Sequence, residues 1–137
     1  MSFFLALLIG CGSKLPTATI QVGDQRVNVE VAATHEHRAL GLKHRDALGA
    51  NQGMLFIYTD NRPRSFWMQN VKFPLSIAFA DRDGTIVRIT DMAPMDTDKT
   101  PSLYPAMYAL EMNKGWFEEH GIEKGAVLTD LPQVDAE

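Results

Sequence analysis

The chain has little cysteine and no excess of positive charge, and each lack excludes a class of protein. It contains one cysteine in 137 residues, which excludes an internal disulfide and a cysteine-rich zinc site. Its 13 basic residues are outnumbered by 17 acidic ones, so the net charge of −4 gives no general attraction for nucleic acid. We therefore expect no nucleic-acid partner.

The rest of the composition is typical of a globular domain, with 45% hydrophobic and 22% charged residues. A chain of this length can bury one core without disulfides or metals. We expect a leader and linker over residues 1–16, one β-rich domain over residues 17–131, and a frayed polar tail over residues 132–137.

The first residues suggest export. Met1–Ile9 form an uncharged apolar run of the length of a signal h-region, too short to cross a bilayer. Residues 8–11 (LIGC) resemble the lipobox of bacterial lipoproteins, in which the cysteine is lipidated. No Lys or Arg precedes Lys14, although a signal peptide normally opens with one. The resemblance implies a periplasmic location with a lipid anchor on Cys11; the alternative is that Cys11 is an ordinary small residue.

Alternating apolar and polar residues predict short strands along most of the chain. The first two are separated by Gly23-Asp24, which favours a hairpin turn, and Thr34 can cap a short helix that runs to about Arg45. A second short helix is expected at 114–120, and the irregular segment 92–104 is a candidate lid. The strands are predicted at 19–22, 25–32, 54–58, 65–69, 75–80, 85–90, 106–112 and 126–130. We therefore predict a mainly β, single-domain antiparallel sandwich or barrel-like fold with about eight short strands and two short helices.

Several short motifs, in this order, resemble one family. They are RALGL at 38–42, GMLF at 53–56, FWMQN at 66–70, FPL at 73–75, and YP at 104–105 followed by ALE at 109–111 and Gly115. The chain is similar in these to the family called domain of unknown function 192, whose members are small prokaryotic proteins that are often exported. The resemblance covers Thr17 to Asp130 and implies a mainly β domain with no established activity. Two positions depart from the family: Ser76 stands where Asp is common, so no role of that carboxylate carries over, and Lys43 replaces the usual Met.

Trp67 and Asn70 are candidate ligand-binding residues. On a strand, Trp67 faces away from Phe66 and Met68, so its indole can line a second surface with the Asn70 amide beside it. The alternative is a core tryptophan, with an asparagine that serves only the turn after the strand.

Arg38 and Glu111 complete the candidate site. Glu111 lies in an apolar strand pattern, where an unpaired carboxylate is costly, so we predict an ion pair with Arg38. The pair could be structural, Arg38 could bind an anion, or Glu111 could point to solvent. A strongly raised pKa of Glu111 in a concave pocket would favour an enzyme, whereas a bidentate pair with Arg38 would favour a structural or binding role.

Signals for metal binding and nucleophilic catalysis are weak. His35, His37 and His44 lack the i, i+4 spacing of a helical metal site, and no serine stands in a G-x-S-x-G motif. We assign no catalytic residue, no metal site and no cofactor. Met92 and Met95, with a histidine, are the candidates for Cu(I).

The sequence thus predicts an exported, lipid-anchored, monomeric domain that binds a small molecule, a glycan or a protein partner. One alternative is a small envelope hydrolase that uses Glu111 or a loop aspartate as general base. The other is a Met/His copper-binding protein.

Overall fold

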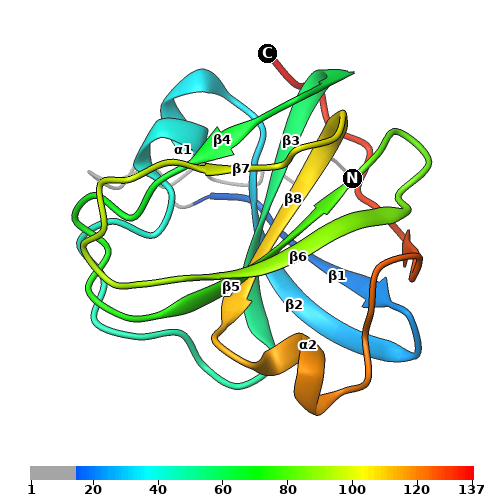
Figure 1. The fold of residues 1–137 in the computed structure, drawn as a ribbon. Coiled ribbons are helices and arrows are strands. Elements are labelled where there is room, and N and C mark those ends of the chain that lie inside the picture. Colours follow the sequence, from blue (N-terminus) through cyan, green and yellow to red (C-terminus); the bar gives the residue numbers. More distant parts are fainter. Residues whose placement is uncertain (1–14) are drawn as a thin grey trace, which may run out of the picture.

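Most of the chain folds into a curled β-sheet with two short helices (Figure 1). The structure is a computed structural model and describes residues 15–137, so the predicted leader and Cys11 lie outside the described residues. The elements in chain order are β1 Thr17–Val22, β2 Gln25–Ala32, α1 His35–Leu40, β3 Gln52–Arg62, β4 Ser65–Phe66, β5 Leu75–Ala80, β6 Ile86–Met92, β7 Thr100–Pro101, β8 Ala106–Asn113, α2 Trp116–Glu119 and β9 Leu128–Thr129.

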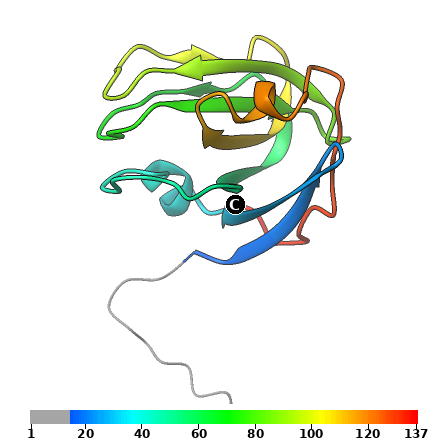
Figure 2. The ribbon, with the colours of Figure 1, turned by 90° about the horizontal axis from the view of Figure 1, so that it is seen from below.

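The main sheet has seven strands in the order β6-β5-β8-β3-β2-β1-β9. Its neighbours are antiparallel except β2 and β3, which run parallel. β9 pairs with β1, and a bridge from Thr85 to Val127 brings the same segment against the start of β6. Figure 2 shows β5 and β6 on one side of the curl and β1 on the other. The prediction of a mainly β, barrel-like fold is confirmed.

Both faces of the central strands β3, β5 and β8 are buried. One face contributes Leu55, Ala78 and Leu110 to a cluster with the outer strands and α2. The opposite face contributes Phe56, Ile77 and other apolar residues to a second cluster, which lies under the segment after α1 and the chain around Val71. Where water reaches neither face, along β5 and over residues 53–57 of β3, the strands are nearly continuous apolar runs.

The covering elements are shorter than the sequence pattern predicts. Thr34 caps α1 as expected, its side chain accepting a hydrogen bond from the His37 N–H at 3.1 Å. The helix ends at Leu40 rather than near Arg45, because Gly41 takes a positive φ of 50°. β4 is likewise a two-residue strand, paired with β7.

The last residues return to the body of the protein. The Glu137 N–H donates to the Ala33 carbonyl at 3.0 Å, and Ala136 packs against the first apolar cluster. From Leu15 to the end of the chain, no helix is both long and apolar enough to cross a membrane.

Candidate functional site

Glu111 is a carboxylic acid in the middle of the sheet. It lies on β8, directly opposite Met54 of β3 on one side and Ile77 of β5 on the other. Both neighbours are fully buried apolar residues, and Glu111 itself is only 5% exposed. The apolar setting predicted for Glu111 is therefore confirmed, and the alternative that it points to solvent is wrong.

A small pocket of about 140 Å³ lies against Glu111 on the face covered by α1. Three of the four candidate residues, Arg38, Trp67 and Glu111, line it together. Its full lining consists of residues Arg38–Lys43, Phe56, Tyr58, Ser65–Trp67, Val71 and Glu111. The volume is enough for several water molecules or one small ligand.

Burial controls the protonation of Glu111. It raises the pKa of this carboxyl group from 4.5 to about 8, because the apolar surroundings penalise the charged form. Within the described part of the chain, no ion pair or hydrogen bond engages the carboxyl group to offset this effect. Glu111 therefore carries its proton at neutral pH and can donate a hydrogen bond into the pocket.

Arg38 does not pair with Glu111, so the predicted ion pair is wrong. Its guanidinium group donates to the carbonyl oxygens of Ala33 at 2.8 Å and Ile57 at 3.0 Å, and also to the backbone oxygen of Glu137. These acceptors lie at the start of α1, on β3 and at the end of the chain. Arg38 thus joins three segments, and these contacts, with a further one to His35 Nδ1 at 3.1 Å, occupy its guanidinium group.

Tyr58 stands between two arginines at the edge of the pocket. The guanidinium carbon of Arg38 lies 4.7 Å from the centre of its ring and that of Arg64 lies 3.8 Å away. Arg64 is fixed by an ion pair with Asp60 at 2.5 Å and a hydrogen bond to the Ala106 carbonyl at 3.0 Å. Burial raises the pKa of Tyr58 despite the opposing charges of Arg64 and Arg38, so its hydroxyl keeps its proton.

Aromatic side chains form much of the pocket wall. The Phe66 ring meets the Phe56 ring edge-to-face at a centroid distance of 5.0 Å, and the Tyr58 ring at 6.4 Å. Trp67 follows on the chain and is 44% exposed, while Met68 is buried. The predicted division of this segment between core and surface is therefore confirmed, and the indole of Trp67 is open to solvent at the pocket.

The segment that carries Trp67 is braced by the long loop. The Met68 N–H donates to the Asp96 carbonyl at 2.8 Å, and the Met95 N–H donates to the Val71 carbonyl at 2.9 Å. The candidate lid over residues 92–104 thus contacts the chain on both sides of Gln69, including Val71 of the pocket lining, but none of its own residues lines the pocket.

The structure places Asn70 outside the pocket lining. It is exposed, has a positive φ of 60°, and its carbonyl accepts from the His44 N–H at 3.5 Å. This geometry is that of a turn residue, since asparagine tolerates the left-handed conformation.

Tyr58, Phe66 and Lys43 are pocket residues that the sequence reasoning missed. Phe56 and Tyr58 share the strand face of Met54, which alternates with the other face along β3. The alternation of faces along this strand therefore predicts that Tyr58 lies on the same side of the sheet as Met54 and Phe56. Lys43 and Phe66 also line the pocket, but turns of the chain bring them there, and no local sequence pattern predicts such a contact.

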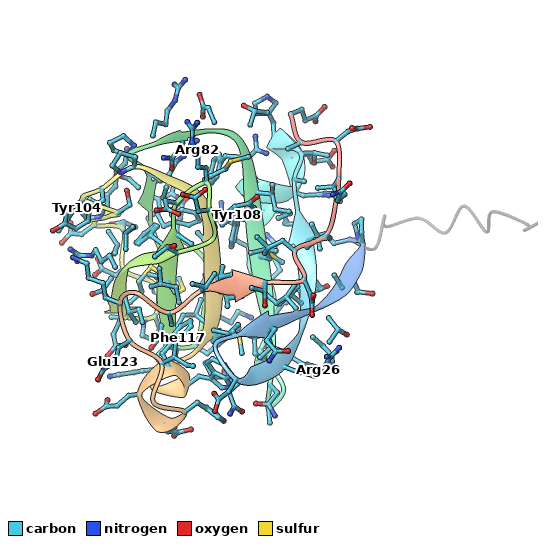
Figure 3. The ribbon with its side chains drawn as sticks, turned by 90° about the vertical axis from the view of Figure 1, so that its right-hand side faces the viewer. Arg26, Arg82, Tyr104, Tyr108, Phe117 and Glu123 are labelled. Atoms are coloured by element: carbon cyan, nitrogen blue, oxygen red, sulfur yellow. The ribbon has the colours of Figure 1, made fainter. Side chains whose placement is uncertain are left out.

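Other features carry less chemistry. A wider groove of about 530 Å³ lies between β6, Tyr104 and α2, where Figure 3 labels Tyr104, Phe117 and Glu123, and its glutamates are exposed.

Met92 is buried at 3% exposure, whereas Met95 is 54% exposed on the loop. Over residues 15–137, no group of three or more His, Cys, Asp or Glu side chains is placed to hold a metal ion.

Comparisons with known proteins agree with the fold. A crystal structure from Sinorhizobium meliloti, of a protein proposed to be a transcription regulator, is 28% identical with a TM-score of 0.83, covering 85% of this chain and 95% of its own. A protein of unknown function from Novosphingobium aromaticivorans is 30% identical with a TM-score of 0.78, covering 83% of this chain and 85% of its own. No curated protein matches the sequence. The family model DUF192, described as Uncharacterized ACR, matches residues 18–129, and the chain therefore belongs to this family.

Proposed function

We propose that the domain binds a small molecule in the pocket formed by Glu111, Tyr58 and Trp67. The observation that carries the proposal is the Glu111 carboxyl group: the residue is only 5% exposed, lines a pocket, and makes no ion pair or side-chain hydrogen bond within the described residues. Burying an unpaired polar group costs free energy, and no structural contact offsets the cost here. A ligand that pairs with Glu111 would supply the missing contact.

The pocket has the composition expected of a small-ligand site. Aromatic walls supply apolar contact area, and a few polar groups, chiefly Glu111 and Tyr58, can fix the orientation of a ligand. Trp67 provides an exposed indole face against which an apolar or charged group can stack. A small molecule fits this volume better than a protein segment or an extended glycan.

The two tryptophans of the chain provide a direct test by NMR. Trp67 lines the pocket, whereas the indole N–H of Trp116 is buried and donates to the Asn51 side chain at 2.9 Å. We expect at least one of three probes, choline, glucose or acetate, to shift the Trp67 signal in a saturable way and to leave the Trp116 signal unchanged. Equal shifts of both signals, or of neither, with all three probes would contradict binding in this pocket.

A pair of variants separates binding from folding. Trp67→Ala removes a half-exposed ring, so we expect little change in melting temperature but at least a tenfold loss of affinity for the probe that binds. Tyr104→Ala is the matched control, because Tyr104 is 46% exposed and lies outside the pocket. If Trp67→Ala unfolds the protein, the ring is part of the core and the proposal loses its support.

Acid–base catalysis is the second candidate function, and the raised pKa of Glu111 in a concave pocket favours it. At neutral pH the protonated carboxyl group would act as a general acid rather than as the general base expected from sequence. Among residues 15–137, Glu111 is also the only carboxyl group that lines the pocket, whereas glycoside hydrolases use two. Hydrolysis of nitrophenyl esters or glycosides that Glu111→Gln abolishes would support catalysis; equal rates in both proteins would exclude it.

We further propose that the protein is exported and anchored in the cell envelope through Cys11. The proposal rests on the apolar run and the LIGC sequence before Gly12. Cys11→Ala should move the protein from the membrane fraction to the soluble periplasmic fraction, with a mass that lacks the lipid. Identical fractionation of Cys11→Ala and the natural chain would show that Cys11 carries no anchor.

A further inference from the structure

Glu111 and the aromatic walls together define a class of ligand. We infer that the pocket takes a small organic ammonium compound, whose positive charge lies beside the Glu111 carboxyl group and against the aromatic rings. This inference rests on the proposed function, because it identifies the ligand of the same pocket.

The first support is the position of the buried acid relative to the rings. Glu111 and four aromatic residues line one pocket of about 140 Å³; the aromatic residues are Phe56, Tyr58, Phe66 and Trp67. Aromatic faces attract cations, and a desolvated carboxylate supplies the full counter-charge. Rings and a single acid in one small volume are the groups that recognise an alkylammonium ion.

The second support is that the charges already present leave Glu111 unpaired. Arg38 and Lys43 line the pocket, and the guanidinium carbon of Arg64 lies 3.8 Å from the centre of the Tyr58 ring. Arg38 donates hydrogen bonds to the carbonyl oxygens of Ala33 and Ile57, and Arg64 forms an ion pair with Asp60. The carboxyl group therefore lacks a positive partner among the described residues, and a ligand cation would provide one.

Binding must displace the proton of Glu111. The balanced step is the ammonium ion plus the protonated carboxyl group giving the ammonium–carboxylate pair plus one proton released to solvent. The proton released is measurable by itself, without knowledge of the natural ligand. A neutral ligand that merely accepts a hydrogen bond from Glu111 would release no proton.

Calorimetry with a matched set of probes tests the inference on the full chain. Choline is permanently charged, dimethylbutanol is its neutral carbon isostere, and trimethylacetate is the corresponding anion. At pH 6.5 we expect choline to bind at least tenfold more tightly than either analogue, and to release close to one proton when two buffers of different ionisation enthalpy are compared. Glu111→Gln should reduce choline affinity at least tenfold and abolish proton release, whereas the control Glu119→Gln, at an exposed position on α2, should change neither.

The outcomes separate this inference from the proposed function. Saturable binding of dimethylbutanol or trimethylacetate with equal or higher affinity, detected at the Trp67 indole, would overturn the ammonium class and leave small-molecule binding in place. Choline binding that releases no proton would also overturn it. Failure of all three probes and of glucose to shift the Trp67 signal would overturn both.

Discussion

Replacing Glu111 by glutamine should make the protein more stable at neutral pH and leave it unchanged in acid. Glutamine has almost the shape of the protonated glutamic acid that the folded protein holds at low pH, and it cannot ionise. The expected gain in the free energy of unfolding arises because the variant has no carboxyl group at position 111 that could ionise. The pH dependence of the gain is therefore a direct measure of the environment of Glu111.

The sign and size of the effect follow from the pKa values. The unfolded chain holds Glu111 at the ordinary carboxyl pKa of 4.5, whereas burial raises it to about 8 in the folded protein. Between these values the folded state binds more protons than the unfolded state, so the free energy of unfolding falls as the pH rises. The penalty is absent below pH 4, reaches roughly 3 kcal/mol at pH 7, and levels off at roughly 5 kcal/mol above pH 8.

Urea denaturation of the natural chain and of Glu111→Gln from pH 4 to pH 9 measures this difference. We expect the two unfolding free energies to coincide at pH 4 and to diverge in favour of the variant as the pH rises. Glu119→Gln, at an exposed position, controls for the loss of one charge. A difference between Glu111→Gln and the natural chain that is constant over the pH range would refute the assignment of a raised pKa.

Three further predictions concern the frame of the pocket. Gly53→Ala should destabilise the fold by about 2 kcal/mol or more, because the added methyl group would overlap the β8 backbone oxygen of Glu111. Urea denaturation measures this loss, and an unchanged free energy of unfolding would mean that the two strands can move apart. Ser102→Ala should lower the free energy of unfolding by about 1–3 kcal/mol, because the buried hydroxyl accepts a hydrogen bond from the Arg64 N–H and donates one to the Tyr104 carbonyl. An unchanged melting temperature would show that other groups replace these hydrogen bonds. Thr34→Ala should cost about 1 kcal/mol by loss of the α1 cap, whereas Thr34→Ser should restore most of it.

The strands and the hairpin were predictable because local patterns determine them. Gly23 supplies the positive φ of 57° that its turn needs, and Leu75–Ala80 coincides with the predicted strand. The end of α1 was misjudged although Gly41 is a recognised stop signal, because the apolar spacing continues past it. Local patterns thus located the elements more reliably than their ends.

The contacts of the site were only partly predictable. The apolar sequence around Glu111 correctly indicated a costly buried carboxyl group, because the pattern reports burial. The choice of Arg38 as its partner failed, because the acceptors of Arg38 are backbone oxygens that every sequence contains. Sequence can therefore indicate that a buried charge needs compensation, but the three-dimensional path of the chain determines whether it receives any.

The pH dependence of choline affinity distinguishes the two ways in which Glu111 could bind a ligand. If an ammonium ion replaces the proton, choline affinity should rise about tenfold for each pH unit up to pH 8, because protons compete for the same carboxylate, and should then become constant. If the protonated acid instead donates a hydrogen bond to a ligand, affinity should be constant below pH 8 and fall above it. Choline carries its charge at every pH, so the slope belongs to the protein. A flat profile for Glu111→Gln beside a rising one for the natural chain would assign the slope to Glu111, whereas a falling natural profile would contradict the ammonium inference.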